Sequence, residues 1–197
     1  DVCSSDLMGI DLEADGLYRV SAIAVRGSSP SASVSAGGDG SAGGDGGAGA
    51  MAAKAPVLVA QGRTVAEAMD ALAGNSARVI DWGNLCSIIL GETLSQNEVN
   101  AVVRAALADP RTPADAILFQ AQGSAEAIVR SEPKGEDHLQ AWLDHYRSKS
   151  YPETPAQFFV PAWRFRSDLI NPGQDAFLGT IALRKADGAP QPTLSGI

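Results

Sequence analysis

The chain has 197 residues, 45% of them hydrophobic, and a formal net charge of −8 at pH 7. This length and apolar content suit one ordinary domain with a real core. The negative charge argues against a nucleic-acid-binding protein, and no apolar run is long enough to span a membrane. Two cysteines and two histidines without ligand-like spacing argue against a disulfide framework and a structural zinc site.

Residues 1–7 look foreign to the rest of the chain. Their sequence, DVCSSDL, resembles the conceptual translation of a sequencing-adapter end. We therefore set this segment and its Cys3 apart from the fold, as one sets apart a fusion scar. The alternative is an ordinary disordered N-terminus. The domain is expected over residues 8–185, with the natural N-terminus and any targeting signal further upstream.

A β-hairpin is predicted at the start of this domain. Residues 9–12 and 17–26 are its arms, and Asp15 with Gly16 forms the turn, because both residues tolerate positive φ. Residues 28–55 then consist mainly of Gly, Ser and Ala. Such a segment buries too little apolar surface to offset its ordering entropy, so a long disordered loop is expected.

Strands and helices alternate after this loop. A short strand at residues 56–60 precedes a helix that begins at a capping box of Thr64 and Glu67. The apolar, β-branched run at residues 85–90 predicts a strand buried on both faces. A second capping box, Ser95 with Glu98, starts the next helix, which should end at Asp109 because Pro110 follows.

The rest of the chain continues this pattern to a less regular end. A strand is expected at residues 116–121, a short helix capped by Ser124 at 125–130, and an amphipathic helix at 136–148. Residues 156–163 fit either a short helix or an extended segment. A turn at 171–173 leads to a last strand at 176–184, and residues 186–197 read as a linker or truncated end. The order predicts an α/β fold with a mixed sheet and flanking helices; α+β is the alternative.

No catalytic, cofactor-binding or metal-binding residue is predicted. Cys86 lies among apolar residues and should be an inert core thiol. His138 and His145 are two helical turns apart, too far to share a metal without other ligands. Ser124 lacks the second glycine of a nucleophile elbow and suits an N-cap. No set combines nucleophile, base and oxyanion donors.

Four side chains are candidates for contact with a partner. Trp82 either covers one end of the sheet or contacts a ligand. Trp163, Arg164 and Arg166 combine aromatic and cationic groups, which suit an anionic surface or a partner protein; local packing is the alternative. We expect an exposed edge containing Trp82 or Trp163 to bind the partner.

The ordered pieces resemble the N-terminal domain of the Ger(x)C spore germination proteins. The stretches that carry the likeness are Gly9-Ile-Asp11 with Tyr18-Arg-Val20, Val59-Ala-Gln-Gly-Arg-Thr64 with Ala66-Glu-Ala68, Arg78-Val-Ile-Asp-Trp82 with Ile88-Ile-Leu-Gly-Glu92, and Arg104 with Ala108-Asp-Pro-Arg111. The chain departs from the family in having no lipidated cysteine, no C-terminal region, and Gly83-Asn84 where many members have a histidine. The resemblance therefore implies a fragment.

The resemblance also implies a function. It predicts a non-enzymatic lipoprotein subunit of a nutrient germinant receptor, held by lipid at the outer face of the inner spore membrane beside two integral-membrane subunits. A small nutrient is a further candidate ligand; no cofactor and no nucleic acid are implied. One alternative is a generic extracytoplasmic α/β interaction module. A small hydrolase or transferase is the other.

Overall fold

The computed structural model describes residues 2–4, 6–23, 25–26, 56–76, 79–148, 159–186 and 188–194. The predicted disordered loop, residues 28–55, lies outside the described residues. The strands are β1 Val2–Ser4, β2 Leu7–Leu12, β3 Tyr18–Ile23, β4 Val25–Arg26, β5 Val57–Gly62, β6 Val79–Asp81, β7 Ser87–Leu90, β8 Ile117–Gln122, β9 Val160–Pro161, β10 Gly179–Ala186 and β11 Ala189–Leu194. The helices are α1 Val65–Asn75, α2 Gln96–Ala108, α3 Ala125–Val129, α4 Leu139–Ser148 and α5 Ala162–Ile170.

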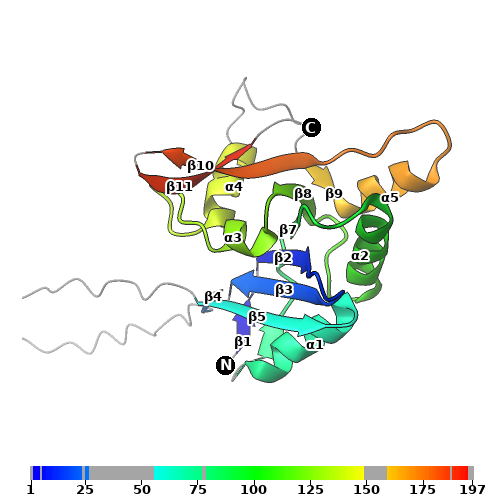
Figure 1. Ribbon diagram of the computed structural model, residues 1–197, viewed down its shortest axis with the longest axis horizontal. Helices are drawn as coiled ribbons and strands as arrows, with labels where there is room; N and C mark the ends of the chain where they lie inside the picture. Colours follow the sequence, from blue (N-terminus) through cyan, green and yellow to red (C-terminus); the bar gives the residue numbers. More distant parts are fainter. Residues whose placement is uncertain are drawn as a thin grey trace, which may run out of the picture.

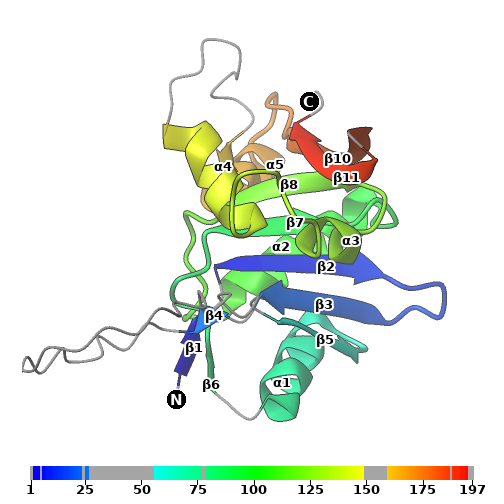
Figure 2. The ribbon, with the colours of Figure 1, turned by 90° about the vertical axis from the view of Figure 1, so that its left-hand side faces the viewer.

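A mixed sheet forms the centre of the molecule. Its strand order is β11-β10-β8-β7-β2-β3-β5, and β9 pairs with the first residues of β8. The four inner strands β2, β7, β8 and β10 are parallel, whereas β3, β5, β9 and β11 are antiparallel to their neighbours. The predicted α/β class and N-terminal hairpin are therefore confirmed. A second, small sheet joins β1 to β4 and β6 (Figure 2).

Both faces of the sheet are covered by helices (Figure 1). α1, α2 and α5 pack on one face, where Ile88 of β7 joins their apolar side chains. α3 and α4 pack on the other, where the neighbouring Ile89 joins theirs. Ile88 is 1% exposed and Ile89 is 0% exposed, so the predicted two-sided burial of this strand is confirmed.

The helix starts follow the sequence signals closely. Ser95 Oγ accepts the Glu98 backbone N–H at 3.4 Å, and Glu98 Oε2 accepts the Ser95 N–H at 2.7 Å, which completes the predicted capping box of α2. At α1, Thr64 Oγ1 accepts the Glu67 N–H at 3.1 Å. The Glu67 carboxylate, however, takes the Arg63 N–H at 2.8 Å instead of that of Thr64, so only half of this box forms as expected.

Three segments differ from the predictions. The first is the segment of residues 1–7, which was expected to lie outside the fold. Val2–Ser4 form β1, and Leu7 is a fully buried residue of β2. The adapter origin of this segment stays a prediction. In the second, Ala189–Leu194 form β11 against β10 in place of the expected linker. Pro190 and Pro192 suggested a loop, but proline is tolerated on an edge strand. In the third, the ambiguous stretch before Trp163 yields β9 followed by the nine-residue helix α5, with Pro161 as its N-cap.

Candidate functional site

The connections that follow two neighbouring parallel strands, β7 and β8, cross to opposite faces of the sheet. After β7 the chain enters α2 on one face of the sheet, and after β8 it enters α3 on the other face. The two strand ends are adjacent, because Leu90 pairs with Gln120. Open α/β sheets bind ligands at such a divergence, outside the carboxyl ends of the strands.

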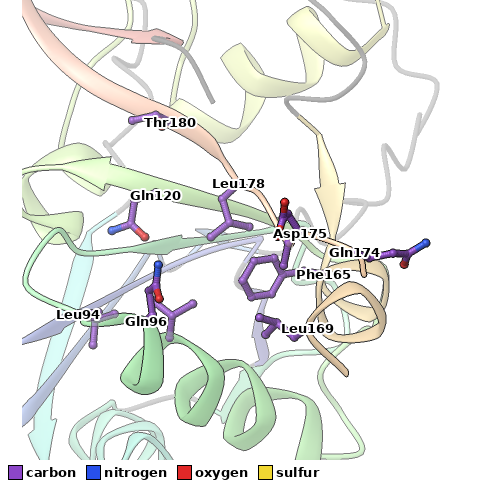
Figure 3. A pocket seen from close by; sticks show the side chains of 11 residues that line it. Leu94, Gln96, Gln120, Phe165, Leu169, Gln174, Asp175, Leu178 and Thr180 are labelled. Atoms are coloured by element: carbon purple, nitrogen blue, oxygen red, sulfur yellow. The ribbon is translucent and has the colours of Figure 1, made fainter. Parts of the chain in front are cut away.

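A cavity of about 510 Å³ opens beside this point (Figure 3). It occupies a part of the sheet face that α2 and α5 leave uncovered, next to the start of β10. Its apolar wall consists of Leu94, Val99, Phe165, Leu169, Ala176 and Leu178. The cavity is therefore a consequence of helix spacing, with apolar side chains from both helices facing one another across it.

Among the described residues, the polar lining of this cavity contains one charged side chain. The polar side chains are Gln96, Gln120, Gln174, Asp175 and Thr180. Gln120 Nε2 donates to the backbone oxygens of Leu90 at 3.2 Å and Gly91 at 2.9 Å, so its amide is held in one orientation. Its Oε1 is left as an acceptor on the cavity side (Figure 3). Gln120 was not among the predicted site residues; its only signal is an amide side chain among the apolar residues Ile117–Ala121 of β8.

A buried carboxylate lies on the other side of the same strand ends. Asp11, which is 6% exposed, accepts the backbone N–H groups of Ala125 at 2.7 Å and Glu126 at 2.9 Å. It also accepts the Ser124 hydroxyl at 3.0 Å. These bonds cap α3, because a carboxylate satisfies the unpaired donors at a helix start. Asp11 thus joins β2 to α3.

The exposed large apolar side chains of the described residues all lie on α5. Trp163 is 55% exposed, Leu169 40% and Ile170 70%. Of the predicted partner contacts, Trp163, Arg164 and Arg166 are exposed on this helix, and Arg164 Nε lies 3.8 Å from Asp168 Oδ2. Trp82 is 1% exposed and belongs to the same core cluster as buried residues of α1 and α2, so the expectation that it lies on an exposed edge is wrong, whereas burial agrees with the alternative of packing against the sheet.

The candidate chemical groups do not assemble into a reactive centre. Cys86 precedes β7, is half-buried rather than in the core, and its Sγ lies 3.3 Å from the Asn84 carbonyl oxygen. Burial, reinforced by Asp144, raises the pKa of this thiol, which disfavours the nucleophilic thiolate. His138 Nδ1 accepts the Ala141 N–H at 3.3 Å at the start of α4. Within the described ranges, no group of three His, Cys, Asp or Glu side chains could hold a metal.

No helix among the described residues is long and apolar enough to cross a membrane.

Comparison with protein families matches residues 5–183 to the spore germination protein N-terminal domain. The chain belongs to this family. The match links the protein to spore germination and confirms the resemblance drawn from the sequence. Searches of curated proteins and of solved structures find no match. The matched residues of this germination domain run from before β2 into β10, and β11 lies beyond them.

The stretches that indicated the germination family have clear structural tasks. Gly62 ends β5 directly under α1, and a Cβ there would lie 2.5 Å from the Ala68 nitrogen. Glu92, after β7, accepts the Gly123 N–H at 2.7 Å and donates its own N–H to the Gly123 oxygen at 3.0 Å. It therefore ties the end of β7 to the end of β8.

Proposed function

We propose that this chain is the N-terminal domain of a C subunit of a nutrient germinant receptor, a non-enzymatic lipoprotein subunit that docks against integral-membrane partners. Membership of a spore germination family supports the general role. The observation that carries the docking role is the outer side of α5. Trp163, Arg166 and Ile170, which we call the α5 surface, follow one another at helical spacing and are all exposed.

The composition of the α5 surface suits a protein partner. Aromatic side chains and arginine are enriched at the centres of protein interfaces, and an exposed tryptophan contributes large contact area. The opposite side of α5 is anchored, because Ala162 is 0% and Phe165 is 5% exposed. A partner would therefore meet a helix that is already fixed in position, which reduces the entropy lost on binding.

Photo-crosslinking in a spore-forming bacterium that carries the full-length gene tests this docking role. Trp163 is replaced by a photoreactive phenylalanine analogue, and Asp70, an exposed residue of α1, is replaced in the matched control. We expect the Trp163 position to crosslink to an integral-membrane germinant receptor subunit and the Asp70 position not to. Crosslinking only to proteins without a role in germination would favour the generic interaction module instead.

Deletion of the gene tests the receptor role itself. We expect the mutant to sporulate normally and to lose its response to particular nutrients. The full-length protein should fractionate with membranes through lipid on an upstream cysteine. In a strain without redundant receptors, a mutant whose spores respond normally to every nutrient would remove the receptor proposal. Turnover of an ester, peptide or phosphate substrate by the purified domain would favour an enzyme.

A further inference from the structure

We infer that the cavity between α2, α5 and β10 binds a small molecule that joins a protonated amine and an amide-like group to an apolar side chain and carries no carboxylate. Its volume of about 510 Å³ falls within the range of roughly 300–1,000 Å³ typical of small-molecule sites. It lies beside the divergence of the β7 and β8 connections, where α/β sheets place ligands. This inference goes beyond the proposed receptor role and requires no partner subunit.

The apolar part of such a ligand has a defined place. Phe165 and Leu169 come from α5, Val99 comes from α2, and Leu178 comes from the segment that enters β10. In Figure 3 the Leu178 side chain lies between the Gln120 side and the Phe165 side of the cavity. An aliphatic group of a ligand would remove apolar surface of both helices from water at once.

The charge of the cavity lining favours a positively charged group on the ligand. Within the part of the chain that the structure describes, Asp175 is the one charged side chain of the lining, and no Lys, Arg or His lines it. A carboxylate entering the cavity would lose hydration without gaining a cationic partner among these side chains, whereas an ammonium could pair with the exposed Asp175 carboxylate. At the positive end of α2, the Glu98 carboxylate accepts the Ser95 N–H and already places a negative charge beside the helix start, which disfavours a second anion.

The amides of the lining supply the remaining specificity. Gln120 is fixed by its two bonds to backbone oxygens and offers Oε1 to the cavity. The Gln96 side chain extends from the first turn of α2 toward the same space (Figure 3). Together they present acceptors and donors to an uncharged hydrogen-bonding group such as an amide.

A matched pair of probes tests the inference on the purified 197-residue chain. L-leucinamide and L-leucine share the isobutyl group and the ammonium, and they differ in that leucine carries a carboxylate. Binding is followed by NMR chemical-shift titration at pH 6.5, where both amines are protonated. We expect saturable binding of leucinamide with shifts at Gln120 and Leu178, and binding of leucine that is at least about tenfold weaker. Equal affinities, or no shifts with millimolar leucinamide, would overturn the inference.

Three variants then locate the site. Asp175→Asn should weaken leucinamide binding by about tenfold, because it removes a charge-assisted hydrogen bond. Asp70→Asn makes the same charge change on α1, away from the cavity, and should leave binding unchanged. Ala176→Phe fills the cavity from a half-buried position and should abolish binding while circular dichroism stays native. Full binding by Ala176→Phe would contradict the assignment. Because the assay uses the isolated chain, its failure would leave the receptor proposal untouched.

Discussion

Gly62 illustrates how one missing side chain can set the distance between two elements. A Cβ at this position would lie 2.5 Å from the Ala68 nitrogen and 2.9 Å from the Glu67 carbonyl carbon, both of them backbone atoms of α1. Gly62→Ala should therefore push α1 away from β5 and lower the free energy of unfolding by about 1–3 kcal/mol. Chemical denaturation measures this change.

Gly74→Ala is the matched control for Gly62→Ala. It adds the same methyl group within α1, where a Cβ would meet nothing within 4 Å. Alanine has the higher helix propensity, so this variant should be neutral or more stable by up to about 1 kcal/mol. Equal destabilisation by the two substitutions would contradict the close-packing explanation.

Cys86 provides a second prediction at the scale of single residues. Its thiol is half-buried, and burial raises its pKa, so the thiolate fraction at pH 7 is lower than that of a free cysteine. In a Cys3→Ser background, labelling by a thiol reagent should proceed slowly in the native protein and accelerate as pH rises. Labelling at pH 7 as fast as in denaturant would contradict this environment.

At the scale of elements, α2 depends on its first turn. Ser95→Ala removes the acceptor of the Glu98 N–H and should lower the free energy of unfolding by about 1 kcal/mol. Asn97→Ala changes an exposed residue of the same turn and should alter stability by less than about 0.5 kcal/mol. Thermal melts of both variants at pH 7 compare them directly. The cap explanation fails if the two melts are shifted equally.

The hydrogen bonds of Glu98 in this capping box make the stability of the folded protein depend on pH. Hydrogen bonds from Ser95 lower the pKa of Glu98 in the folded protein. A lowered folded pKa contributes stability that is present above the unfolded pKa and is lost as pH falls through the folded one. The effect of Ser95→Ala should therefore shrink in acid.

Local sequence signals predicted the helix starts and the hairpin turn well. The predictions that failed concern burial and the cavity, which depend on long-range packing. Ser95 with Glu98 and Asp15 with Gly16 are contained within a few residues, and both formed as expected. The burial of Trp82 depends instead on where α1 and α2 pack against the sheet. The cavity around Gln120 depends on how much of the sheet those helices leave uncovered, which no stretch of sequence specifies.

At the scale of the whole molecule, residues 31–53 should be dispensable. On either side of this segment, Ile23 of β3 pairs with Val57 of β5, so the two strands that it connects are adjacent. Deleting residues 31–53 should preserve the fold and change the free energy of unfolding by no more than about 1 kcal/mol, since loop-closure entropy varies slowly with length. Denaturant titration tests this. A loss above about 2 kcal/mol would show that the segment packs on the domain.

The parallel pairing of the inner strands determines when this protein can fold. Leu7 pairs with Ser87, and Phe119 pairs with Gly179, so the two contacts join parts of the chain that the ribosome makes at very different times. Parallel strands that are so distant in sequence pair slowly during folding. Until β10 emerges, one edge of β8 lacks that partner, and the nascent domain exposes an apolar strand to aggregation. The earlier strands therefore stay open to aggregation until β10, which follows β8 by more than one intervening element, has been synthesised.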